Sequence, residues 1–507
     1  MRVKKIWRMA LIVLLAAAVL GFYMFSSAWK NSSCMGIRIL SEAEMSRFTS
    51  LVPKELSGWI RCSGSTAAVD AGNFKIYISQ NIGENTDYTQ LDGTLAIHNP
   101  EFKLYFAPDE MFSDLDRAVG ENHNFRLIVS SENGEYAQYE VVFTTLPVIN
   151  ISGQKIYTSP DGESVYSGTV TVWDNNFAGV GGITKEETAA QWYIDDKRDA
   201  SEEKRTWRVS IKSDDGSSKT VSLMGQGEED DWIFNGISGD STKLRENLAA
   251  ALWNSMDSTL SPESNMMPEG EYAEVVYNGS YRGIYLVQRR TDQKLLDLDS
   301  NDILLRDKKD RRGSYAKNNY TVRHSHYTDE EVWPVIQSFH SGEDCSMIDI
   351  DNWIDVNIFI NAVCNKGKRN YTEMYYNWQG VDGTPTVTMI PVLSDSLWGV
   401  TVRKNKYVFS ENLSAVEIVY RKEYEQLKEL YPNLDDMIAE RYRQLRDTVL
   451  SREYIEKNAE YILGKFEDSG APERDAQRWE YEKDNDIGKL YSYIEARLKA
   501  MDGFYGV

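Results

Sequence analysis

Residues 272–287 read YAEVVYNGSYRGIYLV and set the local fold near the middle of the chain. Two runs rich in β-branched and aromatic residues, 272–277 and 281–287, flank the dipeptide Asn278-Gly279. Asn-Gly readily adopts the positive φ angles of a two-residue type I′ turn, and this turn matches the twist of paired strands. The stretch therefore predicts an antiparallel β-hairpin.

More strands are expected around this hairpin. Short apolar runs at 167–173, 206–211 and 232–235 have the composition of half-buried strands. Between them we predict a helix that begins near Asp240 or Ser241, two residue types that often cap helices. Its apolar residues recur every four positions along one face, namely Leu244, Leu248, Leu252 and Met256.

The N-terminal part of the chain has the pattern of a separate β domain. Apolar runs such as 74–78 and 125–129 alternate with turn-rich stretches such as 131–134. This pattern predicts a small antiparallel, Ig-like β-sandwich over residues 36–148. A strand at 139–145 then meets Pro147, which cannot donate to a β-ladder, so we place a domain boundary there and a second domain over residues 149–507.

Helical periodicity dominates after about residue 328. We predict a buried helix at 353–363 and a strand at 386–391, followed by two amphipathic helices. The first helix follows a cap at Asn433 and the second a cap at Ser451. Their apolar stripes are Leu434, Ile438, Tyr442, Leu445 and Val449, and then Ile455, Ala459, Ile462 and Phe466. The expected fold class is α+β, with a β-sandwich, a β-rich lobe and a helical lobe.

The first residues suggest a membrane segment. Residues 1–8 are basic, and residues 9–29 carry no charge over a length that crosses a hydrocarbon core as a helix. By the positive-inside rule, residues 1–8 are cytoplasmic and the bulk of the chain is extracytoplasmic. One alternative is a signal peptide cleaved near Ser26-Ser27-Ala28, which would release a secreted protein. Another is a lipoprotein modified at Cys34.

Composition excludes some functions. The chain has 507 residues, 41% of them apolar, which is enough for more than one core. Its formal net charge of −22 repels nucleic acid, so we expect no nucleic-acid partner. Hydrolase elbow, zinc-protease and Walker motifs are absent from the sequence.

The four cysteines do not have the paired spacing of a zinc site. Outside the membrane, Cys34 with Cys62 and Cys345 with Cys364 are candidate disulfides. For Cys364, which ends the apolar run 358–364, a buried free thiol is the alternative.

Four segments, in order, resemble the spore coat protein H (CotH) kinase-like family. Residues 230–235 (DDWIFN) and 242–249 (TKLRENLA) resemble the family's strand and "LRN-LA" helix. Residues 276–286 (VYNGSYRGIYL) are similar to its "NG-Y-GLYLL-E" hairpin. Residues 389–399 (MIPVLSDSLWG) resemble "IPWDLDWSFG", and 469–479 (SGAPERDAQRW) resemble "A--RD--RW". The resemblance runs from about residue 149 to the C-terminus.

The resemblance implies a protein-kinase-like fold. It also implies an activity, the transfer of phosphate from ATP to secreted or surface proteins. Such chemistry uses carboxylates on Mg²⁺ and a cation on the phosphates. Asp395 matches the second Asp of the family's "DLD" and is the implied Mg²⁺ ligand. Asn370 and Glu373 are the nearest remaining candidates for the second metal-binding position.

The candidate phosphate-binding cations come from two segments. Residues 204–209 (KRTWRV) resemble the family's "KKPYRIKL" strand, so Lys204 or Arg205 is the implied cation. Arg289 stands beside the position where the family's hairpin ends in Glu, and we add it to the nucleotide-binding candidates.

The sequence also departs from the family pattern. Leu393 replaces the first Asp of "DLD", and Lys366, Lys368 and Arg369 lie where the second acid is expected. This exchange weakens a Mg²⁺ site, although the basic run is also suited to gripping a triphosphate. An active kinase and a pseudokinase or structural envelope or spore-surface binding protein both remain open. Arg474, Asp475 and Trp479 are expected to be structural, with an Arg-Asp pair beside a packed Trp.

Overall fold

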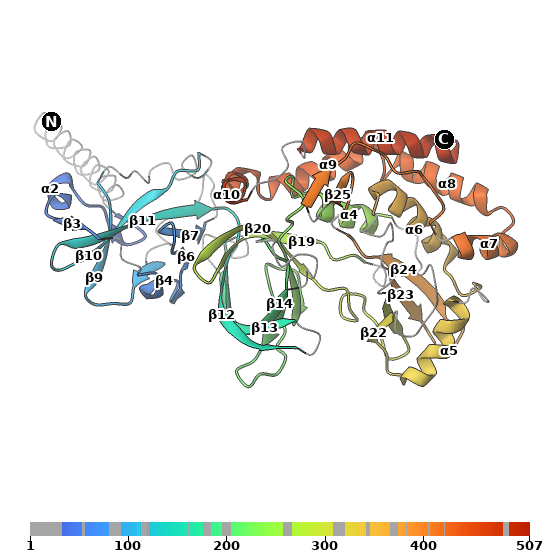
Figure 1. Ribbon diagram of the computed structural model, residues 1–507, viewed down its shortest axis with the longest axis horizontal. Helices are drawn as coiled ribbons and strands as arrows, with labels where there is room; N and C mark the ends of the chain where they lie inside the picture. The colour runs from blue at the N-terminus through green and yellow to red at the C-terminus, as the bar shows by residue number, and fades with distance from the viewer. Residues whose placement is uncertain are drawn as a thin grey trace, which may run out of the picture.

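The computed structural model describes residues 33–52, 56–80, 93–108, 110, 112, 119, 121–159, 163–175, 184–194, 204–256, 266–307, 320–340, 345–365, 374–381, 383–394, 396–403, 406–419, 421–479 and 486–507. Figure 1 shows an elongated arrangement, with the N-terminal strands at one end, a barrel in the middle, and helices with a further sheet at the other end. Within these ranges, no helix is long and apolar enough to span a membrane. The predicted segment 9–29 lies outside them.

The N-terminal unit contains two main sheets. One has the strand order β6-β7-β11-β10-β9, with β3 also on β11, and the other has the order β5-β4-β8. The elements are β1 (Ser33–Cys34), β2 (Ile37–Arg38), α2 (Glu42–Met45), β3 (Ser50–Leu51), a 3₁₀ turn (Ser57–Trp59), β4 (Ile60–Cys62), β5 (Ser65–Thr66), β6 (Ala68–Asp70), β7 (Lys75–Ser79), β8 (Leu95–Ile97), β9 (Phe102–Phe106), β10 (Phe125–Ser131) and β11 (Glu135–Thr144).

The strands expected at 74–78 and 125–129 are present as β7 and β10, but the expectation of purely antiparallel pairing is wrong. β3 and β7 both run parallel to β11. Parallel neighbours need a long connection. The chain provides one, because it forms β8, β9 and β10 between β7 and β11.

A closed barrel follows, with the order β12-β13-β14-β15-β18-β20-β19. Parallel pairing of β12 with β19 closes it, and Val148 lies opposite Glu274. The strands are β12 (Val148–Thr158), β13 (Ser164–Asp174), β14 (Thr184–Ile194), β15 (Trp207–Lys212), β18 (Asp231–Asn235), β19 (Gly270–Tyr277) and β20 (Ser280–Arg289), and a short pair, β16 (Val221–Ser222) and β17 (Glu228–Glu229), lies beside them.

The predicted hairpin is confirmed as β19 and β20. Tyr277 pairs with Ser280, and the turn residues Asn278 and Gly279 have φ angles of 46° and 70°. The strands predicted at 167–173, 206–211 and 232–235 are confirmed as β13, β15 and β18. On β15 and β18, alternate side chains fill the barrel core, so the residues between them face outward.

The rest of the chain combines helices with a sheet of order β22-β21-β23-β24. The helices and strands are α4 (Arg245–Asn254), β21 (Ile303–Asp307), β22 (Tyr320–His324), α5 (Asp329–His340), α6 (Ile350–Val363), β23 (Met374–Gln379), β24 (Thr386–Pro391), β25 (Val400–Arg403), β26 (Lys406–Phe409), α7 (Arg421–Leu430), α8 (Leu434–Asp447), α9 (Arg452–Gly464), a 3₁₀ turn (Glu467–Ser469), α10 (Ala471–Arg478) and α11 (Ile487–Tyr505). The expected mixed α+β class is therefore confirmed.

The helix and strand predictions for this part hold closely. The predicted buried helix, the strand at 386–391 and the two amphipathic helices are present as α6, β24, α8 and α9, and the predicted apolar stripes of α8 and α9 are buried. Ser451 caps α9, because its side chain accepts the amide of Tyr454. Asn433 precedes α8, but its side chain makes no cap hydrogen bond.

Helix α4 begins later than predicted, at Arg245. Lys243 has a φ angle of 61°, which interrupts a right-handed helix. Asp240 still acts as a local cap, because its carboxylate accepts the amides of Thr242 and Arg245. The predicted apolar face of α4 is buried as expected.

The predicted disulfides are absent, since all four cysteines are free and buried. The Cys345 thiol donates to the side-chain oxygen of Gln426 at 2.8 Å. Cys364 ends α6 in a left-handed conformation and contacts Tyr493, so the alternative of a buried thiol is the correct one. The sulfur atoms of Cys345 and Cys364 thus contact neighbouring side chains instead of forming a disulfide bond.

Helix α10 joins the three parts of the molecule. Arg474 makes a two-pronged contact with Glu274 of β19, at 3.0 and 2.7 Å, and reaches Asn122 of the N-terminal unit at 2.5 Å. The next residue, Asp475, instead contacts lysines beside the barrel. The expected Arg474–Asp475 pair is thus wrong, because each side chain pairs with a different element.

Replacing Arg474 with Ala is expected to lower the free energy of unfolding by about 3–5 kcal/mol, because Glu274 stays buried without its cation. Urea unfolding of the full-length chain measures the loss. Arg452→Ala is the control, since Arg452 forms an exposed pair with Glu456 that is worth at most about 1 kcal/mol. Similar losses in both variants would contradict the assigned role of Arg474.

Candidate functional site

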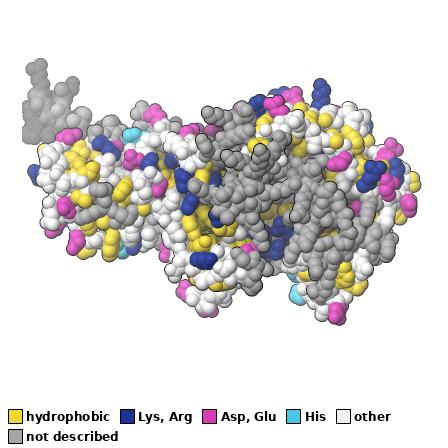
Figure 2. Space-filling model, in the orientation of Figure 1, with side chains coloured by type: hydrophobic (Ala, Val, Ile, Leu, Met, Phe, Trp, Pro, Cys, Tyr) yellow, Lys and Arg dark blue, Asp and Glu magenta, His cyan; other side chains and the backbone are white. Residues whose placement is uncertain are grey.

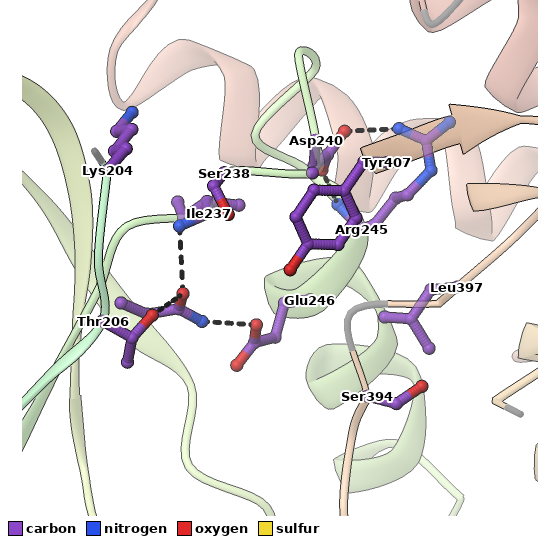
Figure 3. Close-up of a pocket in the computed structure, with 12 residues that line it drawn as sticks. Lys204, Thr206, Ile237, Ser238, Asp240, Arg245, Glu246, Ser394, Leu397 and Tyr407 are labelled. Atoms are coloured by element: carbon purple, nitrogen blue, oxygen red, sulfur yellow. Dashed lines mark hydrogen bonds and ion pairs between the residues drawn. The ribbon is translucent and has the colours of Figure 1, made fainter. Parts of the chain in front are cut away.

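A pocket lies between the outer face of the barrel and the helical part of the chain, with about 480 Å³ of empty space that includes open solvent. Figure 3 shows side chains from both sides pointing toward it. The lining residues are Lys204, Thr206, Asn235, Ile237, Ser238, Gly239, Asp240, Arg245, Glu246, Ser394, Leu397 and Tyr407.

A hydrogen-bond chain forms the barrel side of the pocket. The Thr206 hydroxyl donates to the side-chain oxygen of Asn235 at 3.1 Å, and that oxygen also accepts the amide of Ile237 at 3.0 Å. The Asn235 amide group donates to Glu246 at 2.6 Å. These contacts fix the end of β18 against the first turn of α4 (Figure 3).

Asp240 and Arg245 form a buried ion pair at the start of α4. Burial disfavours the Asp240 carboxylate, but the Arg245 charge and the Thr242 hydroxyl outweigh burial and hold the pKa of Asp240 below its usual value. The Nε and Nη2 atoms of Arg245 are buried and have no hydrogen-bond partner in the described part of the chain. Two guanidinium donors beside the pocket are thus available to an anion.

Lys204 reaches the pocket from just before β15 and is almost fully buried. Its ammonium group lies 2.5 Å from Asp475 Oδ1, and the ammonium of Lys243 lies 3.0 Å from Asp475 Oδ2. Burial and the positive charge of Lys243 lower the pKa of Lys204 to about 7, although Asp475 opposes the shift. Two lysines therefore share one buried carboxylate.

The position of Asp475 depends on Gly283. Asp475 Oδ1 accepts the amide of Ile284 at 2.9 Å. Gly283 has a φ angle of 82°, and a methyl group on it would lie 2.0 Å from that same oxygen. A side chain at 283 is excluded by both backbone conformation and space.

The opposite side of the pocket comes from the segment after β24. Asn365, which follows α6, accepts the Ser394 amide at 2.9 Å and donates to the Val392 carbonyl at 2.9 Å. Trp398 donates to the Ala362 carbonyl at 3.0 Å. Both ends of the segment that carries Ser394 and Leu397 are therefore fixed to the end of α6.

The structure brings some of the sequence-predicted site residues to this pocket. Lys204 lines it, whereas Arg205 is next in the chain but is not a lining residue. Asp395, Asn370 and Glu373 lie outside the described residues, although Ser394, the neighbour of Asp395, lines the pocket. Lys204 and Ser394 therefore face the same space.

Arg289 is not a lining residue of the pocket. It pairs with Trp232 in the ladder between β20 and β18, three residues along β18 from Asn235. Its guanidinium lies 3.8 Å from the buried carboxylate of Glu229. Its assignment to nucleotide binding stays a sequence-based prediction.

Sequence reasoning missed several pocket residues. Arg245 and Glu246 lie inside the segment that resembles "LRN-LA", but we interpreted that segment as a packing helix. Asp240 was interpreted only as a helix cap. No sequence pattern marks Tyr407 as a pocket residue, because it reaches the pocket from the β25–β26 hairpin, far along the chain from β18 and α4.

Two comparisons with known proteins bear on this site. A family model described as "CotH kinase protein" matches residues 195–501, which include the whole lining of the pocket. No curated protein matches the chain.

The low pKa of Lys204 predicts a specific pH dependence of stability. The unfolded chain keeps the Lys204 proton up to about pH 10.5, whereas the folded protein releases it near pH 7. Between these values the unfolded state binds more protons, so the contribution of Lys204 to the free energy of unfolding rises with pH. Wild type is expected to gain stability relative to Lys204→Met from pH 7 to pH 10, as measured by urea unfolding.

Lys212→Met is the matched control, since Lys212 lies on β15 and faces outward. Its difference from wild type should change little over the same range. A constant difference between wild type and Lys204→Met would show that the Lys204 pKa is not lowered.

Proposed function

Because the chain belongs to the CotH kinase family, we propose that its pocket binds ATP and that the protein transfers phosphate to a hydroxyl group of a secreted or surface protein. One observation carries the proposal: Lys204, from the segment that resembles the family's phosphate-binding strand, and Ser394, beside Asp395, line the same pocket. Phosphoryl transfer needs a cation and a metal-binding carboxylate that face the same bound nucleotide.

The proposed domain organisation also rests on the resemblance to the CotH family. Residues 36–148 form an Ig-like sandwich, and residues 149–507 form a kinase-like domain. Its β-rich lobe is the barrel, and its helical lobe contains α4 to α11. The pocket supports this division, since the residues just before β15 and the end of β18 contribute one side and the segment after β24 contributes the other. A cleft between two lobes is the usual place for a nucleotide in kinases.

The described residues fit the anionic part of a nucleotide. Arg245 has two buried guanidinium nitrogens without a partner among them, and Lys204 supplies a second cation. Phosphate oxygens accept from both groups. In this proposal Lys204 and Arg245 bind the phosphates, and the chain of Thr206, Asn235 and Glu246 fixes the pocket wall.

The proposed Mg²⁺ ligands are Asp395, with Asn370 or Glu373. Bound between two phosphates, Mg²⁺ neutralises charge that develops during phosphoryl transfer. Among the described residues, no group of three or more His, Cys, Asp or Glu side chains is arranged to hold a metal ion. The metal assignment therefore rests on the sequence resemblance.

One observation favours a second function, a pseudokinase that binds a nucleotide or a partner without transfer. Leu393 replaces a family carboxylate, and its side chain is partly buried against the main hydrophobic core. An apolar side chain at that position cannot ligate a metal. With a single carboxylate, affinity for Mg²⁺ falls.

The proposed location is the cell surface. Residues 9–29 would anchor the chain, with residues 1–8 in the cytoplasm and both folded units outside. A secreted form after signal cleavage is the alternative. The partner or substrate would then be a surface or secreted protein.

Titration of the full-length chain with ATP and Mg²⁺ is expected to raise its melting temperature, because a ligand that binds only the folded state stabilises it. Incubation with radiolabelled ATP and cell-surface proteins is expected to label a protein substrate. Asp395→Asn should fold normally and reduce transfer about 100-fold, as expected for loss of one charge-stabilising group.

The outcomes separate the candidate functions. Stabilisation by ATP without transfer would assign the protein as a pseudokinase. Neither stabilisation nor transfer would contradict the nucleotide proposal and leave a binding protein of the cell envelope. Asp468→Asn is the matched control, since Asp468 is an exposed acid of the 3₁₀ turn and is not a lining residue of the pocket.

A further inference from the structure

The dipeptide Asn-Gly occurs at residues 133–134, 235–236 and 278–279. In such a pair the glycine nitrogen can attack the side-chain carbonyl carbon of the asparagine, because glycine neither crowds the attack nor restricts the backbone. The resulting ring is a succinimide, which water opens to aspartate or isoaspartate. All three pairs share this chemistry in an unfolded chain, so the fold decides which of them react.

The fold restrains Asn235, at the wall of the pocket. Its side-chain oxygen accepts the Thr206 hydroxyl and the Ile237 amide, and its side-chain nitrogen donates to Glu246 at 2.6 Å. The Gly236 amide donates to the Thr206 hydroxyl at 3.3 Å. To reach the Gly236 nitrogen, the side-chain carbon of Asn235 must leave these contacts, because the reacting atoms need a specific approach. The pair at 235–236 is therefore protected.

The fold also restrains Asn278, in the turn between β19 and β20. Its side-chain nitrogen donates to the Gly153 carbonyl at 3.0 Å, and its side-chain oxygen accepts the Gly153 amide at 2.9 Å. The Gly279 carbonyl accepts the amide of Ala71 at 2.9 Å, so the N-terminal unit holds the turn as well. Asn278 is exposed, yet both polar atoms of its side chain are engaged. Exposure alone does not decide reactivity here.

Asn133, in the turn between β10 and β11, differs from the other two. Its side chain is exposed and makes no hydrogen bond among the residues that the structure describes. The Gly134 amide donates to the Ser131 carbonyl at 3.2 Å, which is close to the length of the Gly236 contact. The glycine amides thus do not separate these two sites. The difference is that the Asn133 side chain is free to change rotamer.

The surroundings of this turn are open and carry both signs of charge. Figure 1 places β10 and β11 at the N-terminal end of the molecule, and Figure 2 shows acidic and basic side chains intermixed on the visible face of that end. The Gly134 carbonyl accepts the amide of Thr49 at 3.1 Å, directly before β3. The turn therefore supports the attachment of β3 to β11.

We propose that Asn133-Gly134 is a site of spontaneous deamidation in the folded protein, whereas Asn235-Gly236 and Asn278-Gly279 are protected by their contacts. The Gly134 nitrogen forms a bond to Cγ of Asn133, the bond from Cγ to Nδ2 breaks, and Nδ2 leaves as ammonia with the proton that Gly134 gives up. Water then adds across one of the two ring C–N bonds, which yields a carboxylate and restores one amide. The proposal rests on these contacts and not on the proposed function.

The modification has a structural consequence for the N-terminal unit. Isoaspartate passes the backbone through the side-chain carbon, so it lengthens the turn between Ser130 and Tyr136, which pair across β10 and β11. A longer turn displaces the Gly134 carbonyl from Thr49. The modified protein also carries one more negative charge at this turn.

Peptide mass spectrometry of the full-length folded chain, after incubation in mildly alkaline buffer, measures the three rates in one sample. Deamidation at Asn133 is expected to be at least about tenfold faster than at Asn235 or Asn278, because two or more hydrogen bonds must break before attack at those sites. In guanidinium chloride the three rates are expected to agree within about threefold, since no site keeps its contacts. Asn133→Gln removes the fast reaction and identifies its site.

Thr206→Val tests the protection of Asn235 without changing the dipeptide. Valine neither donates to the Asn235 oxygen nor accepts the Gly236 amide, so deamidation at Asn235 is expected to rise about tenfold. Thr220→Val is the matched control, since the exposed Thr220 hydroxyl contacts only Glu228 among the described residues. Its three rates should equal those of wild type.

The rate at Asn278 distinguishes local release from unfolding of Thr206→Val. A rise at Asn235 with Asn278 unchanged supports the proposal, and no rise at Asn235 contradicts it. If both rates rise, the variant has unfolded, and the three rates in folded wild type decide. Folded wild type in which Asn133 reacts no faster than Asn235 and Asn278 would overturn the proposal.

Discussion

The structure depends most on one buried carboxylate, Asp475, which is 1% exposed. It accepts the ammonium groups of Lys204 and Lys243 and the backbone amide of Ile284. These partners come from the segment just before β15, the turn before α4, and β20. A buried charge is tolerated only where partners replace the lost water. Asp475 therefore fixes the relative positions of the barrel, α4 and α10, and with them one side of the pocket.

The N-terminal unit is also attached to the barrel and to α10. Its core includes Trp173 and Tyr281 of the barrel, and Tyr281 stacks on Tyr77 with ring centres 4.5 Å apart. Trp173 donates to the carbonyl of Cys62. Together with the contact between Arg474 and Asn122, these interactions attach the unit over a continuous apolar surface. A partner bound by the N-terminal strands would thus be held at a set orientation to the pocket.

Local sequence signals predicted local structure well, and long-range arrangement much less. Asn278-Gly279 gave the hairpin, and the spacing of Leu434 to Val449 gave α8, because both signals act between near neighbours. The parallel pairing of β7 with β11 and the closure of the barrel by β12 and β19 had no local signal. Lys243 interrupts the start of α4, because the Asp240 carboxylate, rather than helix propensity, sets the backbone there.

The same limit applies to the site. Resemblance to a family identified Lys204, which lines the pocket, but it could not reveal that Asp475 and Lys243 share its charge. Arg474 and Asp475 looked like a local pair because they are adjacent. In the folded chain they contact Glu274 and Lys204, which are far away in sequence. Only the three-dimensional structure shows which of several residues of the same charge contacts a given partner.

The separation of 200 residues between Arg474 of α10 and Glu274 of β19 has a consequence for biogenesis. Glu274, Lys204 and Lys243 are buried charges whose partners lie at residues 474 and 475, so they stay unpaired until α10 has been synthesised and, for an exported protein, translocated. Domains usually fold as they emerge. Here the barrel keeps these buried charges unpaired until α10 docks, so a protease cut between β20 and α10 would destabilise the barrel as well as the helical part.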